Sequence, residues 1–414
     1  MSALSALAEP ARAAARALAT MPSDRKAAAL QAMAGSLESR SAEILEANRE
    51  DTVRAADEGT TAAVLDRLTL DEERVAQIAD GVRQVAGLPD PIGEVIEERT
   101  LANGLRVRKV RVPMGIVGVI YEGRPNVTVD AAALAVRAGN AVLLRGSRIA
   151  ERSNAGLVGV IQAAGEREGL PPAAIQGVAP TRESAREMMR ARDLLDLLIP
   201  RGGNDLIQTV VRESQVPVIE TGVGNCHVYV DGAADLEKAL RILVNAKVQR
   251  PGVCNAAESF LVHRDVAPAF LPKALSALAE HGVTVFGDEE VRASGDGVEP
   301  ATDEEFAAEF LDLRISGRVV GSLDEALDHI ARYGTRHTEA IVTEDREAAR
   351  RFTDEVDAAA VMVNASTRFT DGFELGLGAE IGISTQKLHA RGPMALPELT
   401  SYKWVVEGDG QVRA

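Results

Sequence analysis

The spacing of apolar residues divides the chain into a helical opening segment and a longer part in which strands and helices alternate. From about residue 4 to 90, runs rich in Ala and Leu carry interspersed Arg, Asp and Glu, and Pro occurs near predicted helix starts or ends. This pattern predicts an α-rich opening segment.

A β-hairpin is predicted directly after this segment. Residues 95–101 and 105–112 alternate β-branched with charged side chains, and Asn103-Gly104 lies between them. Both residues of this dipeptide tolerate positive φ, which tight hairpin turns require. Charges on both faces place the hairpin outside a hydrophobic core, so it is either a solvated flap or a ribbon that pairs with another subunit.

Between residues 113 and 250, apolar strands are separated by amphipathic helices. The predicted strands are 116–121, 141–144, 194–199 and 216–220, and the predicted helices are 130–138, 182–192 and 235–247. Such alternation predicts an α/β fold with a doubly wound parallel sheet, whose ligands bind at the carboxyl ends of the strands.

A second α/β unit follows. Its predicted strands lie near 259–263, 282–286, 318–320, 340–343 and 360–364, and its helices near 267–281, 323–333 and 346–356. Loops rich in Gly, Ser and Thr at 365–393 then lead to a final strand at 401–407.

Composition narrows the class of protein. The 414 residues carry a net charge of −16, which disfavours a nucleic-acid binder because such a protein needs a concentrated basic surface. No apolar run is long enough for a transmembrane helix, and the N-terminus lacks the basic region of a secretion signal. Two cysteines are too few for a disulfide framework or a Cys-rich zinc site, so a reducing cytosol is expected.

Cys254 is the candidate nucleophile. It lies in a loop after a helix and before a strand, with Pro and Gly ahead of it and small residues behind it. Backbone N–H groups in such a loop can stabilise a thiolate and the oxyanion formed when it attacks a carbonyl. The alternative is an inert buried thiol, which is also our interpretation of Cys226.

Two further positions are candidates at strand ends. Glu220 ends an apolar strand and could be a general base, a hydrogen-bonding anchor or a solvated acid. The Gly202-Gly203 turn follows a strand and opens a helix, which suits an anion at the helix N-terminus, although it is not a G-x-G-x-x-G motif. No spacing of His or carboxylate residues suggests a catalytic metal.

Two late loops, 364–371 and 384–391, collect hydroxyls, amides and cations beside glycines. They are either solvated or a site for a small anionic substrate.

Five stretches together resemble one family. They read PMGIVGVIYEGRPN from residue 113, ETGVGNCH from 220, RPGVCN from 250, VNASTRFTDG from 363 and STQKLHARGP from 384. The chain resembles the γ-glutamyl phosphate reductases, a divergent branch of the aldehyde dehydrogenase superfamily, essentially from end to end. The resemblance implies an NADPH-binding domain at 1–93, 113–250 and 367–395, a catalytic domain at 251–366, and an oligomerisation hairpin and strand at 94–112 and 396–414.

The resemblance also implies roles for single residues. Cys254 takes the nucleophile's role, Glu220 matches the Glu that activates water in aldehyde-oxidising relatives, and Asn126 is the nearest candidate for the oxyanion Asn. The residues implied to bind the cofactor are Arg145, Ser147, Arg148, Gly202, Gly203, Glu309 and Phe310. Arg148 stands where NAD-preferring relatives often carry an acid, which favours NADPH because a cation pairs with a 2′-phosphate.

The expected reaction is NADPH-dependent reduction of L-glutamyl 5-phosphate to L-glutamate 5-semialdehyde, through a thioester on Cys254, in proline biosynthesis. Candidates for holding the phosphate and the α-carboxylate are Arg124, Ser366, Arg368, Lys387 and Arg391. Expected partners are further copies of the chain and, for delivery of the labile substrate, glutamate 5-kinase. The alternatives are oxidation of another small aldehyde and a non-catalytic module that keeps the fold.

Overall fold

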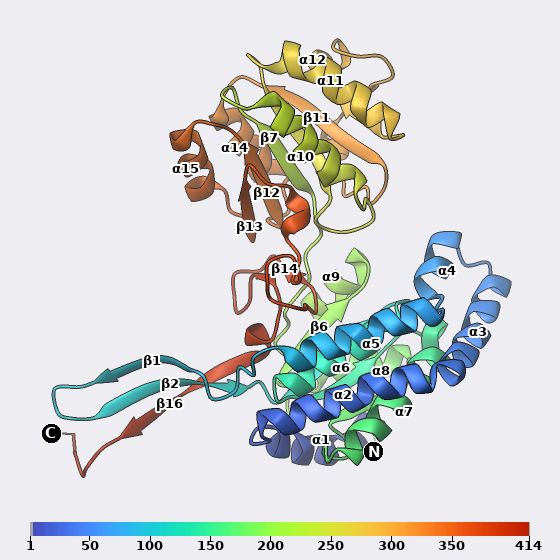
Figure 1. Cartoon of the computed structure of the whole chain (residues 1–414), viewed down its shortest axis with the longest axis vertical. Coiled ribbons are helices and arrows are strands. Elements are labelled where there is room, and N and C mark those ends of the chain that lie inside the picture. Colours follow the sequence, from blue (N-terminus) through green and yellow to red (C-terminus); the bar gives the residue numbers. More distant parts are fainter. Residues whose placement is uncertain (1–2, 414) are drawn as a thin grey trace. The chain divides into compact units, whose positions relative to one another are not determined.

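The computed structural model describes residues 3–413, which form two compact units (Figure 1). Unit 1 contains the chain up to Thr221 together with Leu377–Gly382 and the residues from Met394 onward. Unit 2 contains Gly222–Gly376 and Ile383–Pro393.

The opening segment of unit 1 is helical, as predicted. Its helices are α1 (Ala3–Leu18), α2 (Ser23–Ser39), α3 (Ser41–Asp57), α4 (Ala62–Leu68) and α5 (Glu72–Gly87). The side chain of Asp71 accepts a hydrogen bond from Arg74 N–H and so caps α5. Pro10 lies inside α1 rather than near its end, contrary to the expectation for prolines in this segment.

The central sheet of unit 1 is parallel with strand order β5-β4-β3-β6. Its strands are β3 (Ile116–Tyr121), β4 (Ala141–Arg145), β5 (Ile175–Gly177) and β6 (Leu197–Arg201). The connecting helices are α6 (Asn126–Arg137), the 3₁₀ helix η1 (Arg148–Ala150), α7 (Glu151–Arg167), α8 (Arg182–Arg190) and α9 (Asn204–Glu213). The strand predicted at 216–220 was wrong, because this segment makes only a single bridge, from Val218 to Leu198.

The predicted hairpin is present and belongs to a three-stranded antiparallel sheet of unit 1. It comprises β1 (Val95–Thr100) and β2 (Arg106–Pro113), and the C-terminal strand β16 (Thr400–Glu407) pairs with β2 on its other side. Of the turn residues Asn103 and Gly104, only Gly104 takes a positive φ. Figure 1 shows the ribbon extending away from the helices of unit 1.

Unit 2 contains a parallel sheet of order β10-β9-β11-β8-β7-β12-β13. Its strands are β7 (Cys226–Val230), β8 (Ala257–His263), β9 (Thr284–Gly287), β10 (Glu299–Pro300), β11 (Arg314–Val320), β12 (Thr338–Val342) and β13 (Ala360–Val363). The helices α10 (Leu236–Val248) and α11 (Ala267–Glu280) pack in one apolar cluster, and α14 (Leu323–Tyr333) and α15 (Arg346–Glu355) pack in another. Because side chains alternate along β7, Val228 joins the first cluster and Tyr229 joins the second.

The remaining elements of unit 2 are short. They are α12 (Glu289–Arg292), α13 (Asp303–Ala307), the 3₁₀ helix η2 (Thr367–Phe369), β14 (Ile383–Ser384) and β15 (Gly392–Pro393). In unit 1, the 3₁₀ helix η3 (Pro397–Leu399) precedes β16.

The boundary between the compact units differs from the predicted domain boundary at residue 250. The structure divides the chain after Thr221, and it assigns most of 367–395 to unit 2 as well. The physical reason is strand pairing, because β7 hydrogen-bonds to β8 on one side and to β12 on the other. The prediction separated β7 and α10 from the sheet that they complete.

Candidate active site

The amino ends of the parallel strands of unit 2 form the edge that carries Cys254. This residue lies three positions before β8, in the loop that follows α10, and it is partly exposed. The carbonyl oxygen of Cys254 lies 3.2 Å from the sulfur of Cys226, the first residue of the neighbouring strand β7. The predicted loop position of Cys254 is thus present, while Cys226 is buried in agreement with the prediction.

Glu309 and Phe310 lie at the same edge. The Glu309 carboxylate accepts a hydrogen bond of 2.6 Å from Gly224 N–H, just before β7, and burial raises the pKa of this carboxyl. The Phe310 ring stacks on Phe286 with centroids 5.5 Å apart.

A buried ion pair holds the segment that contains Glu309 and Phe310. Lys247 of α10 lies 2.6 Å from Glu258 of β8, and both side chains are fully buried. The second oxygen of Glu258 accepts a hydrogen bond from Leu311 N–H, next to Phe310. Burial raises the pKa of Glu258 to about 7 and lowers that of Lys247, because each charge has lost its water.

Among the predicted substrate residues, Arg368 lies close to the loop that carries the nucleophile. The side-chain amide of Asn255, the neighbour of Cys254, donates to the carbonyl oxygens of Arg368 and Thr370. Burial lowers the pKa of Arg368, and the charge of this guanidinium interacts with the Cys254 thiol. Ser366 is buried, and its hydroxyl accepts from Arg368 N–H at the start of η2.

Lys387 and Arg391 form a separate group in unit 2. Both contact the carboxylate of Asp357, at 3.0 Å and 2.6 Å, and Arg336 lies 3.6 Å from the same group. These cations hold the pKa of Asp357 below its usual range. The structure therefore places an acid between the two cations that the sequence assigned to substrate.

The carboxyl ends of β3, β4 and β6 in unit 1 carry the predicted dinucleotide contacts. Arg145 donates to the Thr181 carbonyl oxygen at 2.8 Å, whereas its buried Nε has no partner among residues 3–413. The Ser147 hydroxyl accepts from Gly123 N–H, and the side chain of Arg148 is exposed. These donors at a topological switch point fit the phosphates of a dinucleotide.

The Gly202-Gly203 turn has an acidic neighbour, which the spacing of glycines does not indicate. Gly203 N–H at the start of α9 donates to the carboxylate of Glu122 at 2.8 Å. A Cβ at position 202 would lie 2.4 Å from the same oxygen, so a side chain there would displace the Glu122 carboxylate from its present position. The N-terminus of α9 thus binds an anion of the chain itself.

The other predicted residues of unit 1 have varied surroundings. Asn126 begins α6, and its amide donates to Asp130 at 2.9 Å. Arg124 is exposed, and Glu220 is partly buried at the end of the segment beside β6.

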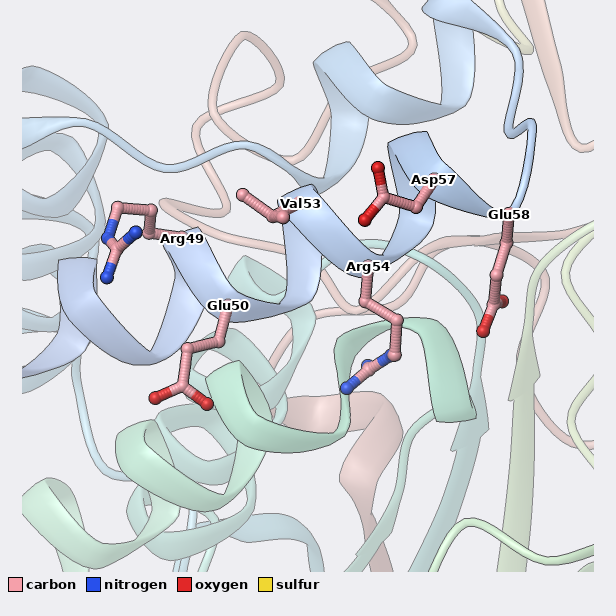
Figure 2. A pocket seen from close by; sticks show the side chains of 6 residues that line it. All are labelled: Arg49, Glu50, Val53, Arg54, Asp57 and Glu58. Atoms are coloured by element: carbon pink, nitrogen blue, oxygen red, sulfur yellow. The ribbon is translucent and has the colours of Figure 1, made fainter.

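A shallow hollow follows the surface of α3 (Figure 2). Its lining residues are Arg49, Glu50, Val53, Arg54, Asp57 and Glu58. Arg54 donates to the carbonyl oxygens of Arg148 and Ile149, which ties α3 to η1. The hollow contains none of the predicted site residues. Arg54, one of its lining residues, fixes the backbone that carries Arg148.

A comparison with protein-family models identifies the class of protein to which this fold and its cysteine-bearing strand edge belong. The model described as the aldehyde dehydrogenase family matches residues 2–294, and the chain belongs to that family. Members of the family use a nicotinamide dinucleotide, and the predicted fold class and family are confirmed.

Within that family, the chain is similar over nearly its whole length to γ-glutamyl phosphate reductases. The protein of that name from Thermobifida fusca is 58% identical over 408 residues, 98% of either chain, and that from Moorella thermoacetica is 56% identical over 97% of either chain. The crystal structure of γ-glutamyl phosphate reductase from Thermotoga maritima superimposes with a TM-score of 0.97 at 47% identity and covers 100% of both chains.

Across residues 3–413, no helix combines the length and apolarity needed to cross a bilayer. No group of three His, Cys, Asp or Glu side chains in the same range is arranged to hold a metal ion.

Proposed function

We propose that the protein reduces L-glutamyl 5-phosphate to L-glutamate 5-semialdehyde with NADPH and releases phosphate, as a step of proline biosynthesis. The observation that carries the proposal is the similarity, over 98% of the chain, to relatives that bear the name γ-glutamyl phosphate reductase. The geometry of unit 2 agrees with it, because Cys254 lies in an open loop beside Arg368, a cation suited to the leaving phosphate.

The chain's own groups perform the acyl transfer. The Cys254 thiolate attacks the acyl phosphate carbonyl, the bond from carbon to the phosphate oxygen breaks, and phosphate leaves with the electron pair. Arg368 stabilises the charge of the leaving group. A thioester remains on Cys254. After a hydride has been added to its carbonyl carbon, the carbon–sulfur bond breaks, which forms the semialdehyde and returns the Cys254 thiolate. NADPH, when bound, supplies the hydride.

We assign the phosphates of the dinucleotide to unit 1 and the nucleophile to unit 2. Arg145 and Ser147 would hold the phosphates, and the Gly202-Gly203 turn would contribute where a phosphate replaces the Glu122 carboxylate at Gly203 N–H. In unit 2, Glu309 and Phe310 are the candidates for the nicotinamide ribose. The exposed guanidinium of Arg148 would pair with the 2′-phosphate and favour NADPH over NADH. The orphaned Nε of Arg145 supports a ligand at this place.

The remaining substrate contacts follow from charge. L-Glutamyl 5-phosphate carries an α-ammonium and an α-carboxylate, and the group of Asp357, Lys387 and Arg391 offers a partner for each. Arg124 and Ser366 are further candidates for holding the substrate, and Asn126 is the candidate for stabilising the oxyanion. Glu220 is proposed as a supporting acid, because the reductive reaction does not require a base at this position.

We propose that the protein acts in the cytosol as a homo-oligomer, with the three-stranded sheet of β1, β2 and β16 as the contact between copies. Glutamate 5-kinase is the proposed source of the labile acyl phosphate. Both edge strands of this sheet, β1 and β16, are open to pairing in the single chain.

The reaction is tested in reverse. Glutamate 5-semialdehyde, NADP⁺ and phosphate are mixed with the protein, each is omitted in turn, and NADPH formation is followed by absorbance. We expect turnover only when all three are present. Turnover without phosphate would instead identify an aldehyde-oxidising enzyme in which water, activated by Glu220, releases the product.

The nucleophile is tested in the same assay with Cys254→Ala. We expect turnover to fall by at least about 10³-fold, because the acyl group has no atom to join. Binding of NADP⁺, measured by calorimetry, should be unchanged. Turnover near the wild-type rate would exclude Cys254 as the nucleophile.

A further inference from the structure

The peptide group between Cys254 and Asn255 is held by residues at the start of β7 that the reaction scheme does not use. The sulfur of Cys226 lies 3.2 Å from the carbonyl oxygen of Cys254. Cys226 is fully buried, and burial raises the pKa of its thiol well above the ordinary value. The thiol therefore keeps its proton and acts as a hydrogen-bond donor.

A second neighbour of Cys226 does not compete for this proton. His337 Nδ1 lies 3.7 Å from the sulfur and 2.9 Å from the hydroxyl oxygen of Thr338. The Thr338 hydroxyl donates its only hydrogen to Thr370, so it accepts from His337 Nδ1–H. Because that nitrogen carries a hydrogen, the Cys254 carbonyl oxygen is the acceptor left for the Cys226 thiol.

Gly224 provides the space in which this carbonyl lies. A Cβ at position 224 would stand 1.5 Å from the Cys254 carbonyl oxygen and 2.5 Å from its carbon. The requirement for glycine is one of space, since Gly224 does not have a positive φ. The Cys226 thiol and the space at Gly224 thus fix the 254–255 peptide in one orientation.

The orientation has a consequence for the N–H of Asn255. In a trans peptide the C=O and N–H bonds point in opposite directions, so the Asn255 N–H points away from Cys226 and Gly224. Asn255 is only 3% exposed, and its side chain is fixed by donation to Thr370. Among residues 3–413, the structure gives its N–H no acceptor. A backbone N–H in a buried residue ordinarily has one, which leaves this donor for a ligand.

We propose that Cys226 is a positioning residue for acyl transfer. With the space at Gly224, its thiol holds the 254–255 peptide so that the Asn255 N–H stabilises the oxyanion formed on attack by Cys254. The inference rests on the proposed function only in taking Cys254 as the nucleophile. It adds a donor next to the nucleophile and a second cysteine that acts through the backbone.

The test compares two reactions of the same sulfur. p-Nitrophenyl acetate acylates the Cys254 thiolate through a tetrahedral oxyanion and releases p-nitrophenolate. Iodoacetamide alkylates the same thiolate by displacement of iodide, and no oxyanion forms. Since the chain has two cysteines, Cys226→Ala and Cys226→Ser each leave Cys254 as the single thiol. Neither probe depends on the identity of the natural substrate.

We expect Cys226→Ala to slow the p-nitrophenolate burst and the forward kcat by about 10- to 100-fold, less than the loss found when an oxyanion donor is removed outright. Alkylation by iodoacetamide should stay within about twofold of wild type, because that transition state makes no use of the N–H. Cys226→Ser retains a donor, and we expect it to restore both rates to within about threefold. NADP⁺ binding should be the same in all three proteins.

Three results would overturn the proposal. They are an unchanged burst in Cys226→Ala, a parallel loss of burst and alkylation, and a Cys226→Ser protein as slow as Cys226→Ala. The result of this two-probe test does not depend on the result of the phosphate-dependent assay that tests the proposed function. A wild-type protein that fails the phosphate-dependent assay but shows the expected pattern with the two probes would reject the substrate and keep the role of Cys226.

Discussion

Asp130 couples the stability of unit 1 to pH. Its carboxyl lies on α6 and accepts from the Asn126 amide, and burial raises its pKa to about 6 although Arg201 opposes the shift. In the unfolded chain the same group titrates near the ordinary value of 3.8. As pH rises between these values, the unfolded chain releases its proton first, so the folded unit loses stability over this window and does not regain it above.

Asp130→Asn should remove this dependence. We expect the variant to be more stable than wild type at pH 7.5 by about 1–2 kcal/mol, with the difference vanishing well below pH 3.8, where Asp130 is protonated in both states. Thermal melts from the acid side of this value up to pH 7.5 measure it. Asp193→Asn, an exposed acid of the same unit, serves as the control and should follow the wild-type curve. A gain that is equal at every pH would contradict the assignment.

Also at the residue scale, the charged side chains of unit 2 neutralise one another before any ligand arrives. Asp357 lies between Lys387 and Arg391, and Lys247 faces Glu258 in the interior. The sequence indicated the cations but not their acidic partners, because Asp357 and Glu258 lie in segments that have no motif. Only the tertiary structure shows which charges are available.

At the scale of elements, β16 carries a row of exposed aromatic and aliphatic side chains. Tyr402, Trp404 and Val406 alternate along the strand, and each is about half exposed. Cations cover them only in part, with Lys109 3.8 Å from the Tyr402 ring and Arg99 over Trp404. Such a strand at a sheet edge is suited to burial against another copy of the chain.

If β16 is buried between copies as proposed, Val406→Lys should dissociate the oligomer, because a lysine there loses its water without an acid to pair with. Light scattering should report a lower mass, and the emission of Trp404, the chain's single tryptophan, should shift to the red. Val412→Lys is the matched control, since Val412 lies beyond the strand and is 89% exposed. An identical mass for both variants would reject the ribbon as the interface.

The secondary structure could be predicted from the sequence where a regular pattern of apolar residues runs through the whole element. The strand β3 and the helix α14 agree with the predicted residues 116–121 and 323–333. Segment 216–220 failed because its apolar residues pack beside β6 without forming a ladder. The pattern could not assign β7 to its sheet, since strand order depends on contacts between residues far apart in sequence.

At the scale of the whole molecule, the two compact units predict where a cofactor changes local stability. A ligand that binds only the folded state protects the groups around it against local opening. If the dinucleotide binds unit 1 as proposed, protection concentrates at the carboxyl ends of β3, β4 and β6. The domain boundary predicted at residue 250 would instead extend the protection through β7 and α10.

Hydrogen exchange with and without NADP⁺ distinguishes these two divisions of the chain. We expect slower exchange at residues 122–123, 145–148 and 202–204, because these residues border the proposed phosphate site. We expect little change along β7 and α10, which are held by the sheet of unit 2 whether or not the cofactor is bound. The Arg148→Glu variant provides the control, since it should show weaker protection at equal NADP⁺ while the exchange of β7 stays the same. Strong protection along α10 in the wild-type protein would place the cofactor against unit 2 and restore the boundary at residue 250.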